Sequence, residues 1–323
     1  MPRTARFATP RTVKAAENAA VIVTVGLIGM TSLTEHARAK VNLTLRVVGR
    51  RPDGYHDLES VVAFADCADR ITLKPGAETS LALSGPSAQD CGETADNLVI
   101  KGVNLLAGEI PGLAGGKFQL EKVLPVAAGI GGGSADAAAA LRCLARANDL
   151  AADDARLFAV ARAVGADVPV CLPSQACVMS GVGDQLAPLV LPPLPCVLVN
   201  PRVGVATAAV FNALGLRHGE LRAGATDILA AVAWPGPGAS RDEWIAALDF
   251  HGNDLEAPAI SVAPVIGEVL EELRVLDGAR LARMSGSGAT CFALFDDDAQ
   301  AQAAAGTLRQ AHPQWWVHAG TLS

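Results

Sequence analysis

A glycine-rich loop is the strongest chemical signal in the chain. Its residues are Gly129-Ile130-Gly131-Gly132-Gly133-Ser134, and an alanine-rich stretch follows at once and runs to about Asn148. Glycine lets the backbone approach a ligand closely and turn its N–H groups toward it. If the alanine-rich stretch is a helix, its free amides and its positive dipole end face the same point. The loop therefore predicts a site for a di- or triphosphate.

Two common phosphate-binding motifs do not fit this loop. A Walker A loop ends in Gly-Lys-Ser/Thr, whereas Gly133 is followed here by Ser134-Ala135. A dinucleotide fingerprint read from Gly129 and Gly131 needs a third glycine at position 134, where serine stands. A flexible connector is the remaining alternative, but connectors rarely lie between a strand and a long alanine-rich helix.

Lys40 and Asp167 are the candidates for charge and proton chemistry. Residues 39–47 alternate apolar and polar types, which predicts a half-buried strand with Lys40 and Asn42 on its polar face. Asp167 lies just after Gly165, where a helix is expected to stop. Taken alone, a lysine on a strand is usually solvated surface, and such an acid could simply cap the next turn.

The elements that must position these residues alternate between strands and helices. We expect strands at 39–47, 61–64, 71–73, 117–123, 197–199 and 290–295, and helices at 98–106, from the glycine loop to 148, at 153–164 and at 264–276. A second glycine-rich turn lies at 283–288, and a proline cluster at 188–195 suits a domain boundary. This order, without internal repeats, predicts a two-domain α+β protein with domains at 35–187 and 195–320.

The composition excludes several classes of protein. Half of the 323 residues are apolar, the formal net charge is −7, and basic residues form no runs, so we expect no nucleic-acid partner. The seven cysteines are scattered and form no CxxC pair, which predicts reduced thiols in a cytoplasmic protein. The six histidines and the single tyrosine show no metal-ligand spacing, so a metalloenzyme site is not expected.

The first thirty-odd residues form a separate region. Several basic residues precede an apolar run from Ala19 to Met30, which superficially resembles a secretory signal. The run is too short to cross a bilayer as a helix, which takes about 20 apolar residues. We expect residues 1–34 to be a leader that is disordered or not native, with Met30 as the true start, and we expect no membrane association.

Three segments together resemble the GHMP kinase superfamily: Ala39–Leu43, Pro125–Ala138 and Met284–Gly288. More narrowly, four segments resemble the members of that superfamily that act on 4-diphosphocytidyl-2-C-methyl-D-erythritol: Arg51–His56, Asp96–Leu98, Gly165–Pro169 and Asn253–Glu256. The resemblance covers about residues 36–320, and Gly54-Tyr55-His56 is its most substrate-specific part. Small-for-small departures leave the mobility of the loop open, at Ala127, Ala128, Ile130, Ala135 and Ala289.

The resemblance implies a two-domain GHMP kinase fold, with an N-terminal ribosomal-protein-S5-like nucleotide domain and a C-terminal ferredoxin-like domain. The active site would lie in the cleft between them. ATP and Mg²⁺ are the implied cofactors, with adenine near Asn97 and Leu98 and the phosphates on the loop. The residues expected at the nucleotide are Asn97, Leu98, Pro125, Ala127, Ala128, Gly129, Ile130, Gly131, Gly132, Gly133 and Ser134. The metal ligands stay unknown, with the Ser134 hydroxyl a weak candidate.

The resemblance also assigns the reaction. ATP would phosphorylate the 2-hydroxyl of the methylerythritol unit, in the non-mevalonate route to isoprenoid precursors. Asp167 would accept the hydroxyl proton or orient the hydroxyl, and Lys40 would hold Asp167 ionised and offset phosphoryl charge. Phosphoryl transfer needs mainly positioning and charge neutralisation, so these groups suffice.

The cytidine end of the substrate has its own implied contacts. His56 would read cytosine, and Tyr55 and Phe211 would sandwich it, since a flat base gains about 1–3 kcal/mol from aromatic stacking. Thr207 and Asn42 are candidate polar contacts. Phe211 could equally be a core residue on the apolar face of a helix, so the stacking role and the core role are given equal weight. We expect a monomer or a weak homodimer.

Three other readings stay open. Another GHMP kinase, of the homoserine or mevalonate type, would keep the loop without needing Gly54-Tyr55-His56. A non-catalytic nucleotide sensor on the same fold could lose Lys40 or Asp167, yet both are present. A dinucleotide-binding oxidoreductase is disfavoured by the absent third glycine.

Overall fold

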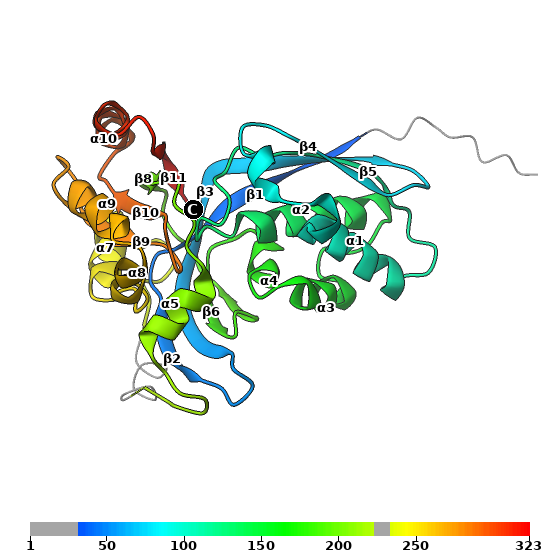
Figure 1. The fold of residues 1–323 in the computed structure, drawn as a ribbon, viewed down its shortest axis with the longest axis horizontal. Helices are drawn as coiled ribbons and strands as arrows, with labels where there is room; N and C mark the ends of the chain where they lie inside the picture. Colours follow the sequence, from blue (N-terminus) through cyan, green and yellow to red (C-terminus); the bar gives the residue numbers. More distant parts are fainter. Residues whose placement is uncertain (1–31, 223–232) are drawn as a thin grey trace, which may run out of the picture. The chain divides into compact units, whose positions relative to one another are not determined.

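The computed structural model describes residues 32–222 and 233–323. The leader predicted for 1–34 lies outside the described residues except for its last three, where the first strand begins at Leu33. Residues from Thr31 to Ser323 form one compact unit that contains two groups of strands with helices packed on them (Figure 1).

The first half is organised around one long strand, β3 (His56–Pro75). On it pair β1 (Leu33–Asn42), β2 (Arg46–Arg50), β5 (Gly116–Glu121) and β6 (Cys177–Gly181), all antiparallel. The outer strands are β4 (Ser80–Ser84), parallel to β5, and β7 (Gln185–Pro188), antiparallel to β6. The helices of this half are α1 (Leu98–Glu109), α2 (Gly132–Ala147), α3 (Ala155–Val164) and α4 (Val168–Cys171).

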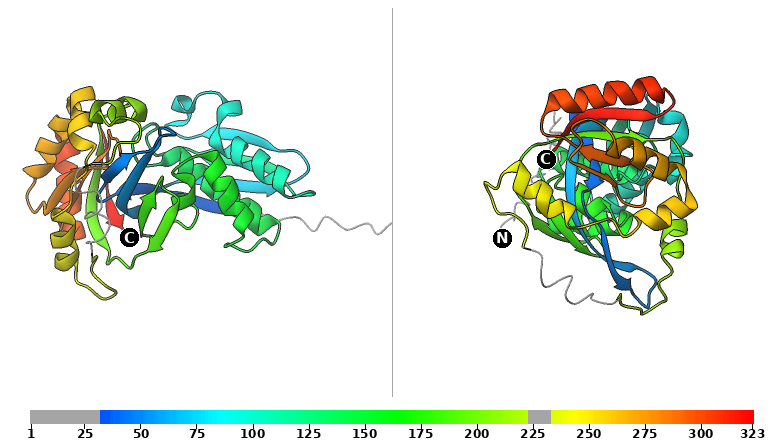
Figure 2. Two further views of the ribbon diagram at one scale, coloured as in Figure 1. Left: turned by 90° about the horizontal axis from the view of Figure 1, so that it is seen from below. Right: turned by 90° about the vertical axis from the view of Figure 1, so that its left-hand side faces the viewer.

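The second half is an antiparallel sheet in the order β11 (Trp316–Leu322), β8 (Leu194–Asn200), β10 (Cys291–Leu294) and β9 (Leu281–Met284). Its helices are α5 (Thr207–Leu214), α7 (Arg241–Asp249), α8 (Glu256–Val262), α9 (Val265–Arg274) and α10 (Asp298–Ala311). Leu322 of β11 pairs with Ala65 of β3, which joins the two groups of strands. Figure 2 shows the two groups and their helices from two further directions.

Three apolar clusters hold the described residues together. One lies between the β3 sheet and helices α1 to α3, and a second lies between the β8 sheet and helices α8 to α10. The third contains Val41 and Leu43 from the first half and Leu194 and Leu198 from the second, together with Ile130 from the glycine loop. Because this third cluster is shared, the glycine loop is anchored by both halves of the fold.

The four helices predicted from the sequence are present as α1, α2, α3 and α9, whereas α4, α5, α7, α8 and α10 were not predicted. Asn97 caps α1, since its side-chain oxygen accepts a hydrogen bond from the amide of Val99 at 2.9 Å. The alanine-rich helix α2 follows the glycine loop as expected, and Asn148 is its C-cap. Asp154 caps α3, whose last residue precedes Gly165.

The strand predicted at 39–47 is wrong in two respects. It is interrupted after Asn42, and β2 begins at Arg46. Its polar face is also buried, with Lys40 only 4% exposed and Asn42 only 1%. The alternating pattern was real, but protein covers the polar face: Lys40 lies against Gly131 and Asp167. Asn42 lies against Ser60 and the turn at Ser285. The strands predicted at 61–64 and 71–73 are likewise parts of the single strand β3.

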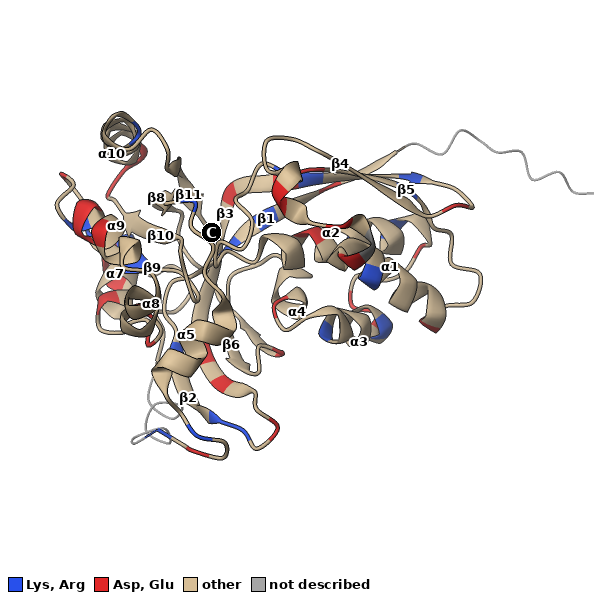
Figure 3. Ribbon diagram, in the orientation of Figure 1, with Lys and Arg blue, Asp and Glu red and all other residues tan. Residues whose placement is uncertain are grey.

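The cysteines, the character of the helices and the distribution of charge complete the description of the fold. All seven cysteines are free, and burial raises the pKa of the Cys143 and Cys171 thiols to about 12, so both are neutral core residues. Within residues 32–222 and 233–323, no helix has the length and apolar character needed to cross a bilayer. Acidic and basic residues are interspersed along both halves (Figure 3).

Candidate active site

A cavity of about 620 Å³ lies where the two halves meet. The glycine loop forms one wall, β1 contributes Lys40 and Asn42, and the second half contributes the turns around Thr207 and Ser287. Of the residues predicted to act in a site, it brings together Lys40, Asn42, Leu98, Ala127, Ala128, Gly129, Gly131, Gly132, Gly133, Ser134, Asp167, Thr207 and Phe211.

Lys40 and Asp167 form an ion pair at this cavity. The Nζ of Lys40 lies 3.0 Å from Oδ2 of Asp167, and the two side chains are 5% and 39% exposed. Lys40 reaches the site from β1, and Asp167 reaches it from the residue before α4. The backbone amide of Lys40 donates to the carbonyl of Ile130 at 2.9 Å, which ties the strand to the glycine loop. The pairing therefore gives both residues a shared place beside the loop.

The glycine loop has the geometry of an amide cradle. Gly129 and Gly131 have φ values of 74° and 64°, in the left-handed region that favours glycine. Gly131 precedes α2 directly, and no side chain caps that helix start. A Cβ on Gly131 would lie 3.3 Å from Cε of Lys40, so glycine also lets the lysine pass close to the loop. The uncapped amides of the first turn are available to bind an anion.

The second glycine-rich turn, Ser285 to Gly288, packs against the first. The hydroxyl of Ser285 accepts a hydrogen bond from the amide of Asn42 at 3.0 Å and donates to the carbonyl of Gly129 at 3.2 Å. A Cβ on Gly129 would lie 2.8 Å from the carbonyl oxygen of Ser285. Two turns from distant parts of the sequence thus fix one another at the cavity.

The Asn253–Glu256 segment holds the second turn from behind. The Nδ2 of Asn253 donates to the carbonyls of Met284 and Gly286, each at 2.8 Å. The carboxylate of Glu256 accepts from the amide of Met284 at 3.0 Å. Thr207 closes the other side, with its hydroxyl 3.0 Å from the hydroxyl of Ser287. These contacts explain why this segment belongs to the resemblance although Asn253 and Glu256 themselves do not line the cavity.

A smaller cavity of about 160 Å³ adjoins the loop. Its walls include Asn97, Leu98 and Pro125, three of the residues predicted near the nucleotide, along with Gly132 and Gly133. The side-chain oxygen of Asn97 already accepts a hydrogen bond from the amide of Val99, so its side-chain NH2 group is the donor left for a ligand. Ile130 lines neither of these cavities and is fully buried in the shared core.

The residues predicted at the cytidine end are only partly assembled. Phe211 and Thr207 line the large cavity, whereas Tyr55 and His56 do not. Tyr55 is 61% exposed, and the His56 ring stacks on Phe211 with centroids 4.4 Å apart. Burial, followed by the charges of Arg50 and His218, lowers the pKa of His56 below its usual range. Neutral imidazole therefore occupies the face of Phe211 that was predicted to stack on a base.

The side chain of Asn42 makes a hydrogen bond through its nitrogen but not through its oxygen. Its Nδ2 donates to the hydroxyl of Ser60 at 2.8 Å, and that hydroxyl in turn donates to the carbonyl of Thr44 at 2.5 Å. Its Oδ1 is buried and has no partner among the described residues. This oxygen faces the second glycine-rich turn, since a Cβ on Gly286 would lie 3.3 Å from it.

A magnesium ion that enters with a nucleotide fits this set of residues. Among residues 32–222 and 233–323 there is no group of three or more His, Cys, Asp or Glu side chains arranged to hold a metal. Mg²⁺ bound to phosphates commonly keeps its waters and needs only one or two protein oxygens. The Ser134 hydroxyl and the Asp167 carboxylate, both at the large cavity, can provide them.

Sequence reasoning overlooked several residues at the site. Ser285 and Asn253 were noted only as parts of motifs, and three buried charged residues behind the loop were not noted at all: Asp69, Lys122 and Asp136. One signal was available, because Asp136 interrupts the run of small apolar residues on α2. A charge in so apolar a stretch requires a buried partner.

Comparison with known proteins gives consistent matches. Residues 97–175 match the family described as GHMP kinases N terminal domain, and residues 239–314 match GHMP kinases C terminal. A Rhodopseudomonas palustris protein named 4-diphosphocytidyl-2-C-methyl-D-erythritol kinase is 68% identical over 90% of this chain and 98% of its own length. A protein of the same name from Bradyrhizobium diazoefficiens is 67% identical over 91% of this chain and 99% of its own length.

Solved structures agree with these matches. A crystal structure of 4-(cytidine 5'-diphospho)-2C-methyl-D-erythritol kinase superposes with a TM-score of 0.70 at 35% identity, covering 90% of this chain and 99% of that one. Homoserine kinase from Cytophaga hutchinsonii superposes with a TM-score of 0.68 at 17% identity, covering 91% and 96%, a likeness of fold alone.

Proposed function

The chain belongs to the GHMP kinase family, and we propose that it phosphorylates the 2-hydroxyl of 4-diphosphocytidyl-2-C-methyl-D-erythritol with ATP. The two-domain α+β fold and the kinase class follow from the family. The choice of acceptor is supported by relatives of that name at 68% and 67% identity over almost their whole length. Such an enzyme would serve the non-mevalonate route to isoprenoid precursors in the cytoplasm.

One observation carries the proposed chemistry: the Lys40–Asp167 pair lies at the same cavity as the glycine loop. Phosphoryl transfer requires a cradle for the phosphates, a positive charge and a group that receives the acceptor's proton. The loop amides, the Lys40 ammonium and the Asp167 carboxylate supply these three within one space.

The residues divide the reaction between them. The Asp167 carboxylate accepts the proton of the 2-hydroxyl or orients it, while the hydroxyl oxygen bonds to the γ-phosphorus and the bond to ADP breaks. Lys40 offsets the charge on the transferring group, and the amides of Gly131 to Ser134 hold the phosphate oxygens. Mg²⁺, bound with the phosphates beside Ser134, would supply further charge neutralisation.

The acceptor is held from the other side of the cavity. Asn42 Oδ1 is a free acceptor beside Lys40, and Thr207 and Phe211 provide polar and apolar surface at the opposite wall. For cytosine to lie between Tyr55 and Phe211, the His56 ring must leave the face of Phe211. His56 would then be placed to contact the base edge. The proposal therefore includes a local rearrangement of the 55–56 segment on substrate binding.

A coupled ADP-release assay tests the proposal. The purified full chain is given ATP, magnesium and one of three acceptors: the cytidine-diphospho substrate, homoserine or mevalonate. We expect turnover with the cytidine-diphospho compound and at most background with the other two. Turnover with homoserine or mevalonate alone would assign another GHMP activity. Nucleotide binding without any turnover would favour a non-catalytic sensor. Gel filtration in the same buffer tests the expectation of a monomer or weak homodimer.

A further inference from the structure

Three buried charges lie directly behind the glycine loop. The ammonium of Lys122 forms ion pairs with the carboxylates of Asp69 and Asp136, the latter at 2.7 Å. Asp69 is 0% exposed, Lys122 2% and Asp136 3%. Removing charged groups from water costs free energy, and apolar residues in their place often give a protein that is at least as stable. A buried ion pair is therefore weak evidence for a role in stability alone. The proposed chemistry of Lys40 and Asp167 makes no use of any of them.

Two of the three residues flank the glycine loop in the sequence, and the third, Asp69, lies on β3. Lys122 follows β5 and stands at the loop's entry, while Asp136 lies in the first turns of α2, at its exit. Asp69, from β3, also fixes the entry, because its Oδ1 accepts hydrogen bonds from the amides of Val123 at 2.6 Å and Leu124 at 2.9 Å. One connected set of charges therefore spans both ends of residues 125–131.

The set also lies close to the amides that would bind phosphate. A Cβ on Gly132 would be 3.6 Å from Nζ of Lys122, so the ammonium is adjacent to the start of α2. Lys122 and Asp136 line the small cavity together with Gly132, Gly133 and Leu98. One oxygen of Asp136, Oδ1, is buried without a partner among the described residues, a cost that a purely structural ion pair would avoid.

We propose that Asp69, Lys122 and Asp136 form an ionic clasp that sets the distance between the ends of the glycine loop and so positions its amides for the nucleotide phosphates. The three are positioning residues, since they act through the loop backbone. The inference rests on the proposed function only in that the loop binds a nucleotide. Pulling the ends apart would move the amides of Gly132 and Gly133 relative to those of Gly129 to Gly131, and phosphate binding would weaken.

The charge states inform the conditions of a test. Burial raises the pKa of Asp136 to about 7, against the lowering effect of Lys122. For Lys122, burial lowers the pKa, but the charges of Asp136 and Asp69 outweigh it and hold the pKa above its usual value. Measurements at a pH of about 8 therefore compare a charged clasp with its neutralised variants.

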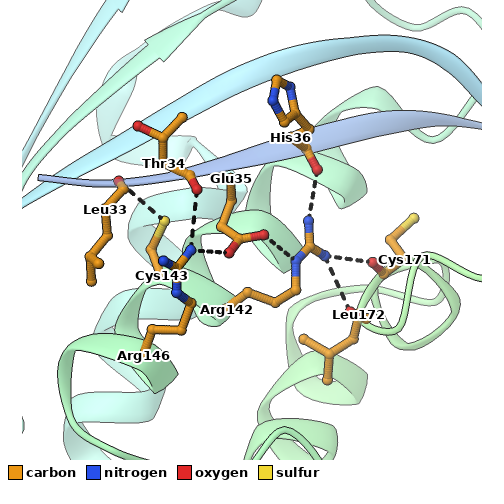
Figure 4. A network of polar contacts seen from close by, with 9 residues as sticks. All are labelled: Leu33, Thr34, Glu35, His36, Arg142, Cys143, Arg146, Cys171 and Leu172. Atoms are coloured by element: carbon orange, nitrogen blue, oxygen red, sulfur yellow. Dashed lines mark hydrogen bonds and ion pairs between the residues drawn. The ribbon is translucent and has the colours of Figure 1, made fainter.

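A second ion-pair network on α2 supplies the matched control. At the far end of the helix, Arg142 pairs with Glu35 of β1 at 3.0 Å and donates to the carbonyl of His36 at 2.7 Å (Figure 4). Arg146 pairs with the same glutamate at 2.7 Å. This network also fastens α2 to the sheet, but it does not touch the loop. Loss of Arg142 should therefore cost stability without moving the phosphate site.

The test compares Asp136→Asn and Lys122→Met with Arg142→Met in the full chain. Binding of magnesium-ADP is measured by calorimetry, and melting temperature is recorded alongside. We expect Asp136→Asn, which keeps the shape of the side chain, to weaken ADP binding about tenfold. Lys122→Met should weaken it at least as much if it folds. Arg142→Met should lower the melting temperature and leave the ADP dissociation constant within about twofold of the original.

Two results would overturn the clasp: an unchanged ADP affinity in Asp136→Asn, or an equal loss in Arg142→Met at matched melting temperature. In the kinetic assay, the clasp variants should raise KM for ATP and leave KM for the acceptor within about twofold. The ADP measurement needs no acceptor. If the original chain binds ADP but does not phosphorylate the cytidine-diphospho substrate, the proposed function fails while the clasp proposal is still tested by the variants. Failure of the original chain to bind ADP would overturn both inferences.

Discussion

The ammonium of Lys40 and the carboxylate of Asp167 meet at 3.0 Å beside the cavity, and the aspartate is the more exposed of the two side chains, at 39% against 5%. Lys40 is held on a buried strand whose amide is bonded to the glycine loop, whereas Asp167 stands before a single-turn helix. The carboxylate can therefore turn toward an acceptor hydroxyl while the ammonium stays beside the phosphates. This asymmetry is what a proton acceptor and a charge stabiliser require of their positions.

Replacing Asp167 with asparagine should lower turnover at least a hundredfold, because assistance by a general base is worth about 10²–10⁴ in rate. ATP affinity should fall only modestly, since the loop amides are untouched. Steady-state kinetics with ATP and the cytidine-diphospho substrate measure both. Asp153→Asn is the control, because it makes the same chemical change at an exposed carboxylate that does not line the cavity. Turnover close to that of the original protein would remove Asp167 from the mechanism.

Tyr55→Ala should raise KM for the cytidine substrate far more than KM for ATP, because Tyr55 is exposed, precedes the His56 that stacks on Phe211, and lines neither cavity at the loop. A lost base–aromatic contact of about 1–3 kcal/mol corresponds to a rise of roughly five- to 150-fold. Leu221→Ala removes another exposed apolar side chain and should change neither constant. Equal effects of Tyr55→Ala on both substrates would contradict the stacking role.

Gly129→Ala should destabilise the protein by about 2 kcal/mol or more, since φ is 74° there and the new Cβ would press on the carbonyl of Ser285. Urea denaturation measures the free energy of unfolding. Gly252→Ala is the control, because a Cβ there meets nothing within 4 Å and φ is not in the left-handed region. A loss no greater than that of the control would mean that the two glycine turns are not tightly packed.

Acidification should destabilise the protein partly through His56. Burial lowers the pKa of this imidazole in the folded protein, so below a pH of about 6.5 the unfolded chain binds the proton more readily. The free energy of unfolding therefore rises with pH across that window and falls on acidification. His56→Gln should lose less stability than the original protein between pH values of about 7.5 and 5.5. Parallel losses in the two proteins would show that His56 does not contribute.

Much of the candidate site was predictable because its parts are local. The loop, the helix after it and the Asn97 cap are each encoded within a few consecutive residues, and all three are present. The resemblance supplied Lys40 and Asp167, whose pairing no spacing in the sequence could give. Their meeting depends on how β1 and the segment before α4 pack, which is a property of the assembled fold.

The parts that sequence reasoning missed depend on distant contacts. The polar face of β1 was predicted to be exposed, but it is buried. Alternation of apolar and polar residues does not show whether water or further protein covers the polar face. The clasp joins Lys122 to Asp69, a residue well before it in the chain, so no local pattern shows the pair. The stacking of His56 on Phe211 likewise joins β3 to α5 and leaves Tyr55 outside.

The bond between the Ser285 hydroxyl and the Gly129 carbonyl has a consequence for synthesis of the protein. A ribosome that has just released the first half from its exit tunnel has made every residue of the nucleotide cradle but not the turn that braces it. The proposed nucleotide site is therefore braced only once almost the whole chain has been made. Nucleotide should act as a late stabiliser of the finished enzyme, and not as a template during translation.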